Sequence, residues 1–120
     1  MAILINKFIQ SRPKKLPEIN KIESVAATII HKNHPIDIVS AYCPHGECDK
    51  NGFLQLLHAI GERGIIAGDF NGHHSFWESE ATPNRAGSAI TGALDEDHRF
   101  IICTPKDLGT RRGTKHQQLT

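Results

Sequence analysis

Runs of apolar residues divide the first half of the chain into three predicted strands. Residues 2–8, 23–31 and 36–42 are rich in Ile, Val and other strand-forming residues. Residues 11–17 hold two prolines and three basic residues, which predicts an exposed loop. The turn at residues 32–35 is so short that the strands on either side of it are expected to be antiparallel neighbours.

The strongest helical pattern follows residue 49. Its apolar side chains fall at i, i+3, i+4 and i+7 and form one stripe: Phe53, Leu56, Leu57 and Ile60. Asp49 precedes the stripe and can cap the helix. Residues 64–68 predict a short buried strand, so strand, helix and strand follow one another within about 33 residues. Such a βαβ unit has parallel strands and a right-handed crossover.

Parallel strands of one βαβ unit end at the same edge of the sheet. Tyr42 and Asp69 close the two strands, so they are expected to emerge side by side, where ligands bind in sheets of this kind. Farther along, Asn84 can cap a second helix that runs to about residue 94. Residues 99–103 predict a final strand, and the polar tail from residue 107 shows no core pattern.

Length and composition describe one small globular domain. The 120 residues are 38% hydrophobic and 22% charged, ordinary values for a folded chain. The net charge of +1 excludes the strongly basic surface of a dedicated nucleic-acid-binding domain, although a local phosphate site is compatible with it. The chain shows no signal peptide and no apolar run of about 18 residues, so we expect an intracellular protein without a transmembrane segment.

The three cysteines, Cys43, Cys48 and Cys103, show no disulfide framework, and we interpret them as reduced thiols. Cys103 lies in the predicted last strand and is expected to be a small buried hydrophobic residue. Cys43, His45 and Cys48 supply zinc-ligand types within six residues, and the histidines at 73 and 74 could join them. Because the spacing lacks a regular partner pair, loop thiols are the favoured interpretation and zinc is the alternative.

The segment after the predicted strand 64–68 holds the candidate chemistry. Asp69 follows the strand directly, so a rigid element would position its carboxylate to orient a water molecule or to bind a cation. Asn71 offers an amide donor to a phosphoryl oxygen and an acceptor to a water molecule. An Asx-type turn between these two residues is the structural alternative, and their spacing is compatible with both interpretations.

Further polar and aromatic residues surround this segment. His73 and His74 add donors that could contact a phosphate, and Trp77 could stack on a base. Tyr42 has two interpretations, since a tyrosine at a strand end can pack as an amphipathic side chain or present its hydroxyl to a ligand. Its expected place beside the aspartate favours the second interpretation.

The segment also carries a recognisable motif. Residues 68–71 read G-D-F-N, followed by His-His at 73–74 and by Trp77. This pattern resembles a motif of the endonuclease/exonuclease/phosphatase superfamily. It is most similar to the apurinic-type endonuclease domain of non-LTR (LINE-like) retrotransposons.

Other motifs of that group follow in the same order. They are a strand ending in Tyr42 and followed by Pro44, the element N-x-x-G at 84–87 with Leu94, and T-R at 110–111. The resemblance extends from about residue 2 to residue 111. We therefore assign residues 1–120 to one partial domain, with a core over 2–111 and a polar tail over 112–120.

The resemblance implies a fold and a reaction. The fold is α/β (α+β sandwich type), a four-layer arrangement of mixed sheets and outer helices of which this chain would supply a part. The reaction is Mg²⁺-dependent hydrolysis of DNA phosphodiester bonds. In it Asp69 activates the attacking water, Asn71 holds the phosphate and the water, and Tyr42 contacts the phosphate, while the metal stabilises charge. Residues expected to bind the substrate are His73, His74, Trp77 and Asn84.

Parts of the family pattern are not matched. The metal-binding glutamate of the family belongs to strands before the one that resembles residues 2–8, and its second aspartate and closing Asp-His pair belong to strands after the end of this chain. We therefore assign no metal ligand here and expect a fragment of a reverse-transcriptase polyprotein that is inactive alone. Exposed sheet edges and marginal stability are expected with it. A nuclear location would follow from the resemblance.

Two alternatives stay open beside the endonuclease. The first is a non-catalytic nucleic-acid-binding or mobile-element remnant, in which basic residues at 11–15 and 111–115 would touch a phosphate backbone. The second is a phosphatase of the same superfamily. The His-His pair, Trp77 and the N-x-x-G element favour the retrotransposon group over the phosphatase.

Overall fold

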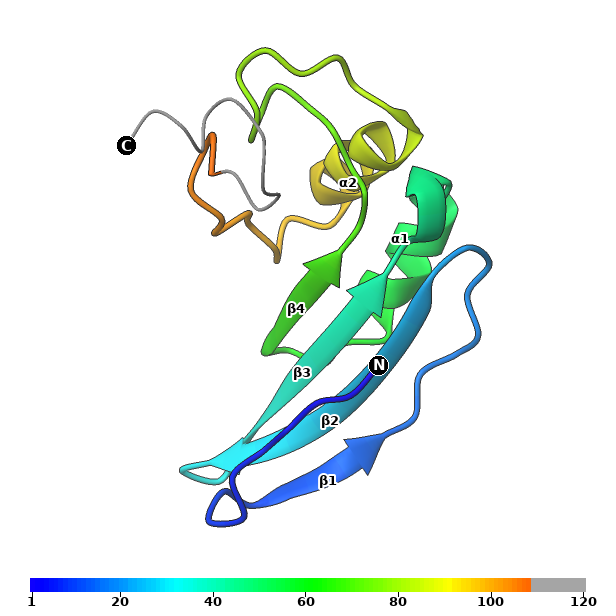
Figure 1. The fold of residues 1–120 in the computed structure, drawn as a ribbon. Helices are drawn as coiled ribbons and strands as arrows, with labels where there is room; N and C mark the ends of the chain where they lie inside the picture. Colours follow the sequence, from blue (N-terminus) through cyan, green and yellow to red (C-terminus); the bar gives the residue numbers. More distant parts are fainter. Residues whose placement is uncertain (109–120) are drawn as a thin grey trace.

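Four strands form one mixed sheet in the computed structural model, which describes residues 1–108 (Figure 1). In order across the sheet they are β1 (Ser11–Lys14), β2 (Glu23–His31), β3 (His34–Tyr42) and β4 (Gly64–Asp69). β2 is antiparallel to both β1 and β3, whereas β3 and β4 are parallel. The turn at residues 32–33 has positive φ at both positions, the geometry that joins twisted antiparallel strands directly. The predicted hairpin is confirmed.

Two helices lie on one side of this sheet. α1 (Lys50–His58) connects β3 to β4, and α2 (Arg85–Glu96) packs against α1. A short 3-10 turn (Pro44–Gly46) precedes α1. Asp49 caps α1 as predicted, because its Oδ1 accepts a hydrogen bond of 2.8 Å from the Gly52 N–H. The βαβ unit and the α/β fold class are therefore the predicted ones.

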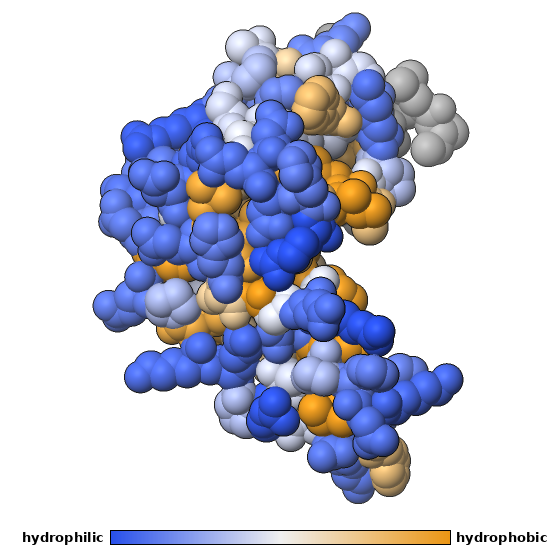
Figure 2. All heavy atoms as spheres, turned by 180° about the vertical axis from the view of Figure 1, so that it is seen from behind, coloured by the Kyte–Doolittle hydropathy of each residue, from blue (hydrophilic) through white to orange (hydrophobic). Residues whose placement is uncertain are grey.

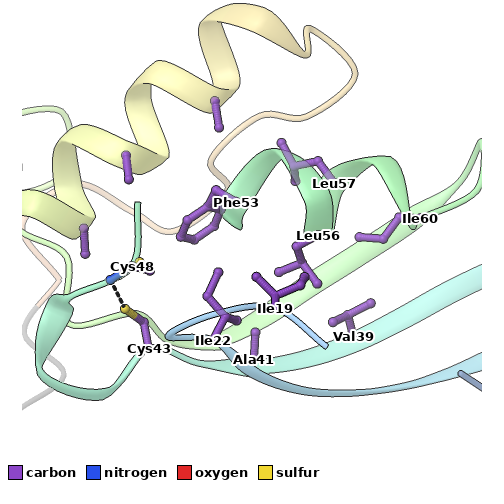
Figure 3. Packing of buried hydrophobic residues seen from close by; sticks show 13 residues of the cluster. Ile19, Ile22, Val39, Ala41, Cys43, Cys48, Phe53, Leu56, Leu57 and Ile60 are labelled. Atoms are coloured by element: carbon purple, nitrogen blue, oxygen red, sulfur yellow. Dashed lines mark hydrogen bonds between the residues drawn. The ribbon is translucent and has the colours of Figure 1, made fainter. Parts of the chain in front are cut away.

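The apolar stripe of α1 forms the centre of the core (Figure 3). Its four residues are each at most 4% exposed: Phe53, Leu56 and Leu57 within α1, and Ile60 two residues after it. They share one cluster with Val39 and Ala41 of β3 and with Ile19 and Ile22 of the segment before β2. Burying one such large side chain contributes about 1.5–3 kcal/mol, so this stripe is the main stabilising contact between helix and sheet.

Residues 2–8 form no strand, which corrects the prediction. Leu4 and Phe8 are 95% and 86% exposed. The free edge of β2 is instead taken by β1, which lies inside the segment predicted to be a loop. Pro13 is compatible with this position because β1 is an edge strand, where a missing N–H leaves no partner unsatisfied.

Residues 99–103 also form no strand. Ile101 and Ile102 are 80% and 40% exposed, and Cys103 is exposed rather than buried, which corrects both predictions. An apolar run becomes a strand only where a partner strand is available, and within residues 1–108 no strand lies beyond β4. The segment is held by Arg99, whose guanidinium donates to the Leu57 carbonyl at 2.8 Å at the end of α1.

β4 is an edge strand, and the prediction of a buried strand is wrong. Ile66 packs against the core, but its neighbour Ile65 is 58% exposed on the opposite face of the sheet. Ile65 is the register partner of Ile38, which is half-buried. On this face residues 1–5 run alongside β2 (Figure 1).

The side of the molecule seen in Figure 2 is mostly hydrophilic, and hydrophobic residues reach its surface in separate places. The large hydrophobic residues that are exposed lie mainly before β1 and after α2; among them are Met1, Leu4, Phe8, Ile9, Ile101, Ile102 and Leu108. Within the described part of the chain, no helix has the length and apolar character needed to cross a bilayer.

A buried carboxylate joins β1, β2 and β3 near the start of β3. Asp37 accepts hydrogen bonds from the Thr28 hydroxyl at 2.7 Å, from Lys14 Nζ at 2.8 Å and from the Gly61 N–H at 2.7 Å. Burial raises the pKa of Asp37, but these hydrogen bonds outweigh it and hold the pKa below its usual value. Asp37 is thus a structural residue, well separated along β3 from the end where Tyr42 lies.

Candidate functional site

The ends of β3 and β4 bring Tyr42 and Asp69 to one edge of the sheet. The two residues are partners in the parallel ladder, and the N–H of Cys43 donates to the Asp69 carbonyl at 2.9 Å. Both side chains are exposed, Tyr42 at 37%. Gly68 allows the close approach, because a Cβ there would lie 1.8 Å from the Ala41 carbonyl oxygen. The prediction that both residues emerge together is confirmed.

Asp69 and Asn71 are joined by an Asx-type turn. The Asn71 N–H donates to Asp69 Oδ1 at 3.0 Å, and Asn71 adopts a left-handed conformation with φ of 48°. Asp69 Oδ2 has no hydrogen-bond partner among the described residues. The turn therefore occupies one carboxylate oxygen and leaves the other exposed, so the structural and the chemical interpretation of this pair are compatible.

The side chain of Asn71 is oriented by the end of β3. Its Nδ2 donates to the Cys43 carbonyl at 3.0 Å, while no described residue donates to its Oδ1. The side chain is half-buried, so its oxygen is an available acceptor held at a defined place. Tyr42, Asp69 and Asn71 thus belong to one hydrogen-bonded edge.

The histidines and the tryptophan lie in the loop that follows. His73 Nδ1 is 2.9 Å from Glu78 Oε1, a partner that the sequence did not indicate. His74 accepts a hydrogen bond from the Phe76 N–H at 3.1 Å, and its ring lies 5.6 Å from that of Trp77. The Trp77 indole N–H donates to the Gly72 carbonyl at 3.0 Å. His73 is exposed, whereas His74 and Trp77 mainly hold the loop together. Their roles in substrate binding stay predictions.

Asn84 lies at the junction of this loop with α2. It caps α2 as predicted, since its Oδ1 accepts from the Gly87 N–H at 2.8 Å. The same oxygen accepts from the His73 N–H at 2.8 Å, and its Nδ2 donates to the Asn71 carbonyl at 2.7 Å. Its predicted contact with substrate stays a prediction, but its side chain already serves three backbone groups. The spacing N-x-x-G was the one sign of this role in the sequence.

The cysteines at this edge are buried thiols. Cys43 and Cys48 are fully buried, and the Cys48 N–H donates to Cys43 Sγ at 3.0 Å (Figure 3). Burial raises the pKa of the Cys48 thiol, which disfavours its thiolate form. Within residues 1–108 no group of three or more His, Cys, Asp or Glu side chains is arranged to hold a metal ion. Cys43 and Cys48 therefore lie buried next to each other, and the choice between loop thiols and zinc stays open.

Some predicted features lie outside the described residues. They are the T-R element at 110–111, the basic residues at 111–115 and the polar tail at 112–120. The basic residues at 11–15 are described, and Lys14 among them is paired with the carboxylate of Asp37 at 2.8 Å.

A comparison with protein families gave a match that covers this edge of the sheet. A family model described as endonuclease-reverse transcriptase matches residues 36–119, which is more than half of the chain. The matched range begins within β3 and includes all the candidate residues from Tyr42 to Asn84. Neither the curated proteins nor the solved structures gave a match.

Proposed function

The chain belongs to the endonuclease-reverse transcriptase family, and we propose that Tyr42, Asp69 and Asn71 form part of the phosphodiester site of a retrotransposon-type DNA endonuclease. The observation that carries the proposal is the parallel pairing of Tyr42 with Asp69, extended by the bond from the Cys43 N–H to the Asp69 carbonyl. This pairing holds the motif residues on rigid strand ends. Rigid placement is what a group that must orient a water molecule requires.

Each of the three side chains has a free group suited to the proposed reaction. Asp69 Oδ2 can accept a proton of the attacking water, and Asn71 Oδ1 can accept a second hydrogen bond from the same water. The second N–H of Asn71 Nδ2 can donate to a phosphate oxygen. The Tyr42 hydroxyl is exposed and can donate to a phosphate oxygen. Asp69→Ala is therefore tested by cleavage, whereas Asn71→Ala and Tyr42→Phe are tested by DNA binding.

Mg²⁺ is the cofactor that this family resemblance implies. Mg²⁺ requires near-octahedral oxygen coordination, usually with one or two carboxylates as well as the phosphate of the substrate. Asp69 offers one carboxylate, with one oxygen already accepting the Asn71 N–H, and residues 1–108 contain no cluster arranged for a metal ion. The described residues therefore do not fit a complete magnesium site. We propose that the 120-residue chain binds DNA at this edge but needs further ligands for cleavage.

Two assays on the 120-residue chain test the proposal. In the first, supercoiled plasmid is incubated with Mg²⁺ and with wild type or Asp69→Ala, and we expect no nicking by either. Nicking by wild type that Asp69→Ala abolishes would support the role of Asp69 and overturn the need for further ligands. Equal nicking by both would contradict the role assigned to Asp69.

The second assay is fluorescence anisotropy with a short labelled DNA duplex. Asn71→Ala is expected to weaken binding about tenfold, and Tyr42→Phe, which removes one hydroxyl, about threefold to tenfold. Asn33→Ala is the matched control, since Asn33 also has a left-handed backbone, with φ of 65°, but lies in the hairpin at the other end of the sheet. Unchanged affinity in Asn71→Ala, or an equal loss in Asn33→Ala, would contradict the proposal.

A further inference from the structure

The loop that holds Asn71 is fastened to α2 by one side chain. Asn84 uses both ends of its amide: Oδ1 accepts from the His73 N–H and the Gly87 N–H, each at 2.8 Å. Nδ2 donates to the Asn71 carbonyl at 2.7 Å. The backbone adds a fourth bond, from the Asn84 N–H to the His73 carbonyl at 3.1 Å. Helix cap and loop anchor are therefore the same group.

The backbone segments around the Asn84 amide are closely packed. A Cβ on Gly87 would lie 1.9 Å from the His73 carbonyl oxygen. A Cβ on Gly46 would lie 2.9 Å from Asn84 Nδ2 and 2.7 Å from the Asn71 carbonyl oxygen. Both glycines permit the loop, the 3-10 turn and α2 to approach one another closely. The placement of Asn71 therefore depends on contacts from two other elements.

Capping alone does not explain an asparagine at this position. A cap needs only a side-chain oxygen, so Ser, Thr or Asp would serve as well as Asn. The nitrogen of Asn84 has a separate use, because it donates to the Asn71 carbonyl. The orientation of the amide follows from its neighbours, since two N–H groups face the oxygen and a carbonyl faces the nitrogen.

We propose that Asn84 is a positioning residue, which holds Asn71 in its left-handed conformation and so directs the Asn71 side chain toward the site edge. This inference rests on the proposed function and deepens it. It differs from a direct contact between Asn84 and the substrate. It also separates two tasks of one amide: the oxygen caps α2 and holds His73, and the nitrogen holds Asn71.

Asn84→Asp separates these tasks. The variant keeps the oxygen that accepts from His73 and Gly87, and a negative charge at a helix N-terminus is favourable. It replaces the donor to the Asn71 carbonyl by a second acceptor, so two oxygens repel each other there. Asn51→Asp is the matched control, because Asn51 is exposed and lies in the first turn of α1. Asn84→Ala removes both functions together.

Three measurements on the 120-residue chain test the inference. Urea unfolding is expected to give Asn84→Asp a midpoint close to that of Asn51→Asp, and Asn84→Ala a lower one. The Asn71 side-chain amide signal in ¹H–¹⁵N NMR spectra is expected to shift in Asn84→Asp and to stay in place in Asn51→Asp. Affinity for a labelled DNA duplex is expected to fall about tenfold in Asn84→Asp and to stay unchanged in Asn51→Asp.

Each outcome bears on the inference. An unmoved Asn71 signal in Asn84→Asp overturns it, and so does wild-type DNA affinity in that variant. If wild type binds no DNA, the proposed function fails, while the Asn71 signal still decides whether Asn84 positions the loop. If Asn84→Asp does not fold, Asn84→Ser, which keeps a capping oxygen without the charge, is measured instead with the same expected results.

Discussion

Replacing Gly87 by alanine tests the contact between α2 and the site loop through stability. Alanine inside a helix is ordinarily up to about 1 kcal/mol more favourable than glycine. At residue 87, however, the new methyl group would lie 1.9 Å from the His73 carbonyl oxygen and 2.6 Å from its carbon. Overpacking of this kind costs about 1–3 kcal/mol, and a backbone group fixed by Asn84 cannot move away easily. We expect a net loss of about 2 kcal/mol in the free energy of unfolding.

Gly92 provides the control for this substitution within the same helix. Its nearest neighbour would be Lys50 Cδ at 3.2 Å, the middle of a flexible side chain that can move. Gly92→Ala is therefore expected to raise the free energy of unfolding by up to about 1 kcal/mol. The same chemical change is thus expected to have opposite signs at two positions of α2.

Urea unfolding, followed by far-UV circular dichroism and by the fluorescence of the single tryptophan, measures both variants. With a slope of about 1–3 kcal/mol/M, a loss of 2 kcal/mol lowers the midpoint by about 1 M. An increase in stability for Gly87→Ala, equal to that for Gly92→Ala, would refute the contact between α2 and the loop. The anchoring of Asn71 would then need another explanation.

Three further predictions concern the rest of the fold. Asp37→Asn is expected to lower the free energy of unfolding by about 2–3 kcal/mol at neutral pH, because it disrupts a buried pair. Because folding lowers the pKa of Asp37, its contribution to the free energy of unfolding is complete above the unfolded pKa of about 3.9 and is lost as pH falls through the folded pKa. Urea titrations at several pH values should therefore show that acid lowers the free energy of unfolding less in the variant than in wild type. Thiol labelling followed by mass spectrometry is expected to modify Cys103 rapidly in the native protein and Cys48 only after unfolding, because Cys48 is buried and its thiol has a raised pKa; equal rates would contradict the described burial. Arg99→Ala is expected to cost about 1 kcal/mol in urea unfolding, because the Leu57 carbonyl loses a charged donor; an unchanged midpoint would show that this segment does not stabilise α1.

The sequence predicts those elements whose partners lie nearby along the chain. The hairpin of β2 and β3 follows from two apolar runs and a short turn, and the βαβ unit follows from the α1 stripe between two strands. Both depend on local periodicity and on the known handedness of crossovers. The meeting of Tyr42 with Asp69 is a consequence of that topology, which is why the order of strand, helix and strand is enough to predict it.

The errors concern segments whose state depends on distant partners. Residues 2–8 and 99–103 have the composition of strands, yet within the described chain no strand pairs with them. β1 forms despite Pro13 because the free edge of β2 accepts it, and β4 is exposed because it is the last strand of the described sheet. Composition indicates which secondary structure a segment can form, whereas the pairing of a strand depends on which sheet edges the rest of the fold leaves free.

In the candidate site, too, local features follow from the sequence and contacts between distant residues do not. The place of Asp69 at a strand end, with Asn71 shortly after it, follows from the sequence, as does the capping of α2 by Asn84. The bonds from Asn84 to residues 71 and 73 join positions at least 11 residues apart, and they could not be derived from spacing. The glycine three residues after Asn84 was the available sign, since a helix interior has no need of it.

The most direct measurement of the central claim is an NMR titration of the ¹⁵N-labelled chain with a short DNA duplex. We expect chemical-shift changes to concentrate at Tyr42 and at residues 69–74, on the edge where β3 and β4 end. Little change is expected in the hairpin at residues 32–33, at the opposite end of the sheet. Changes centred on that hairpin, or none at the strand-end edge, would contradict the assignment of this edge as the phosphodiester site.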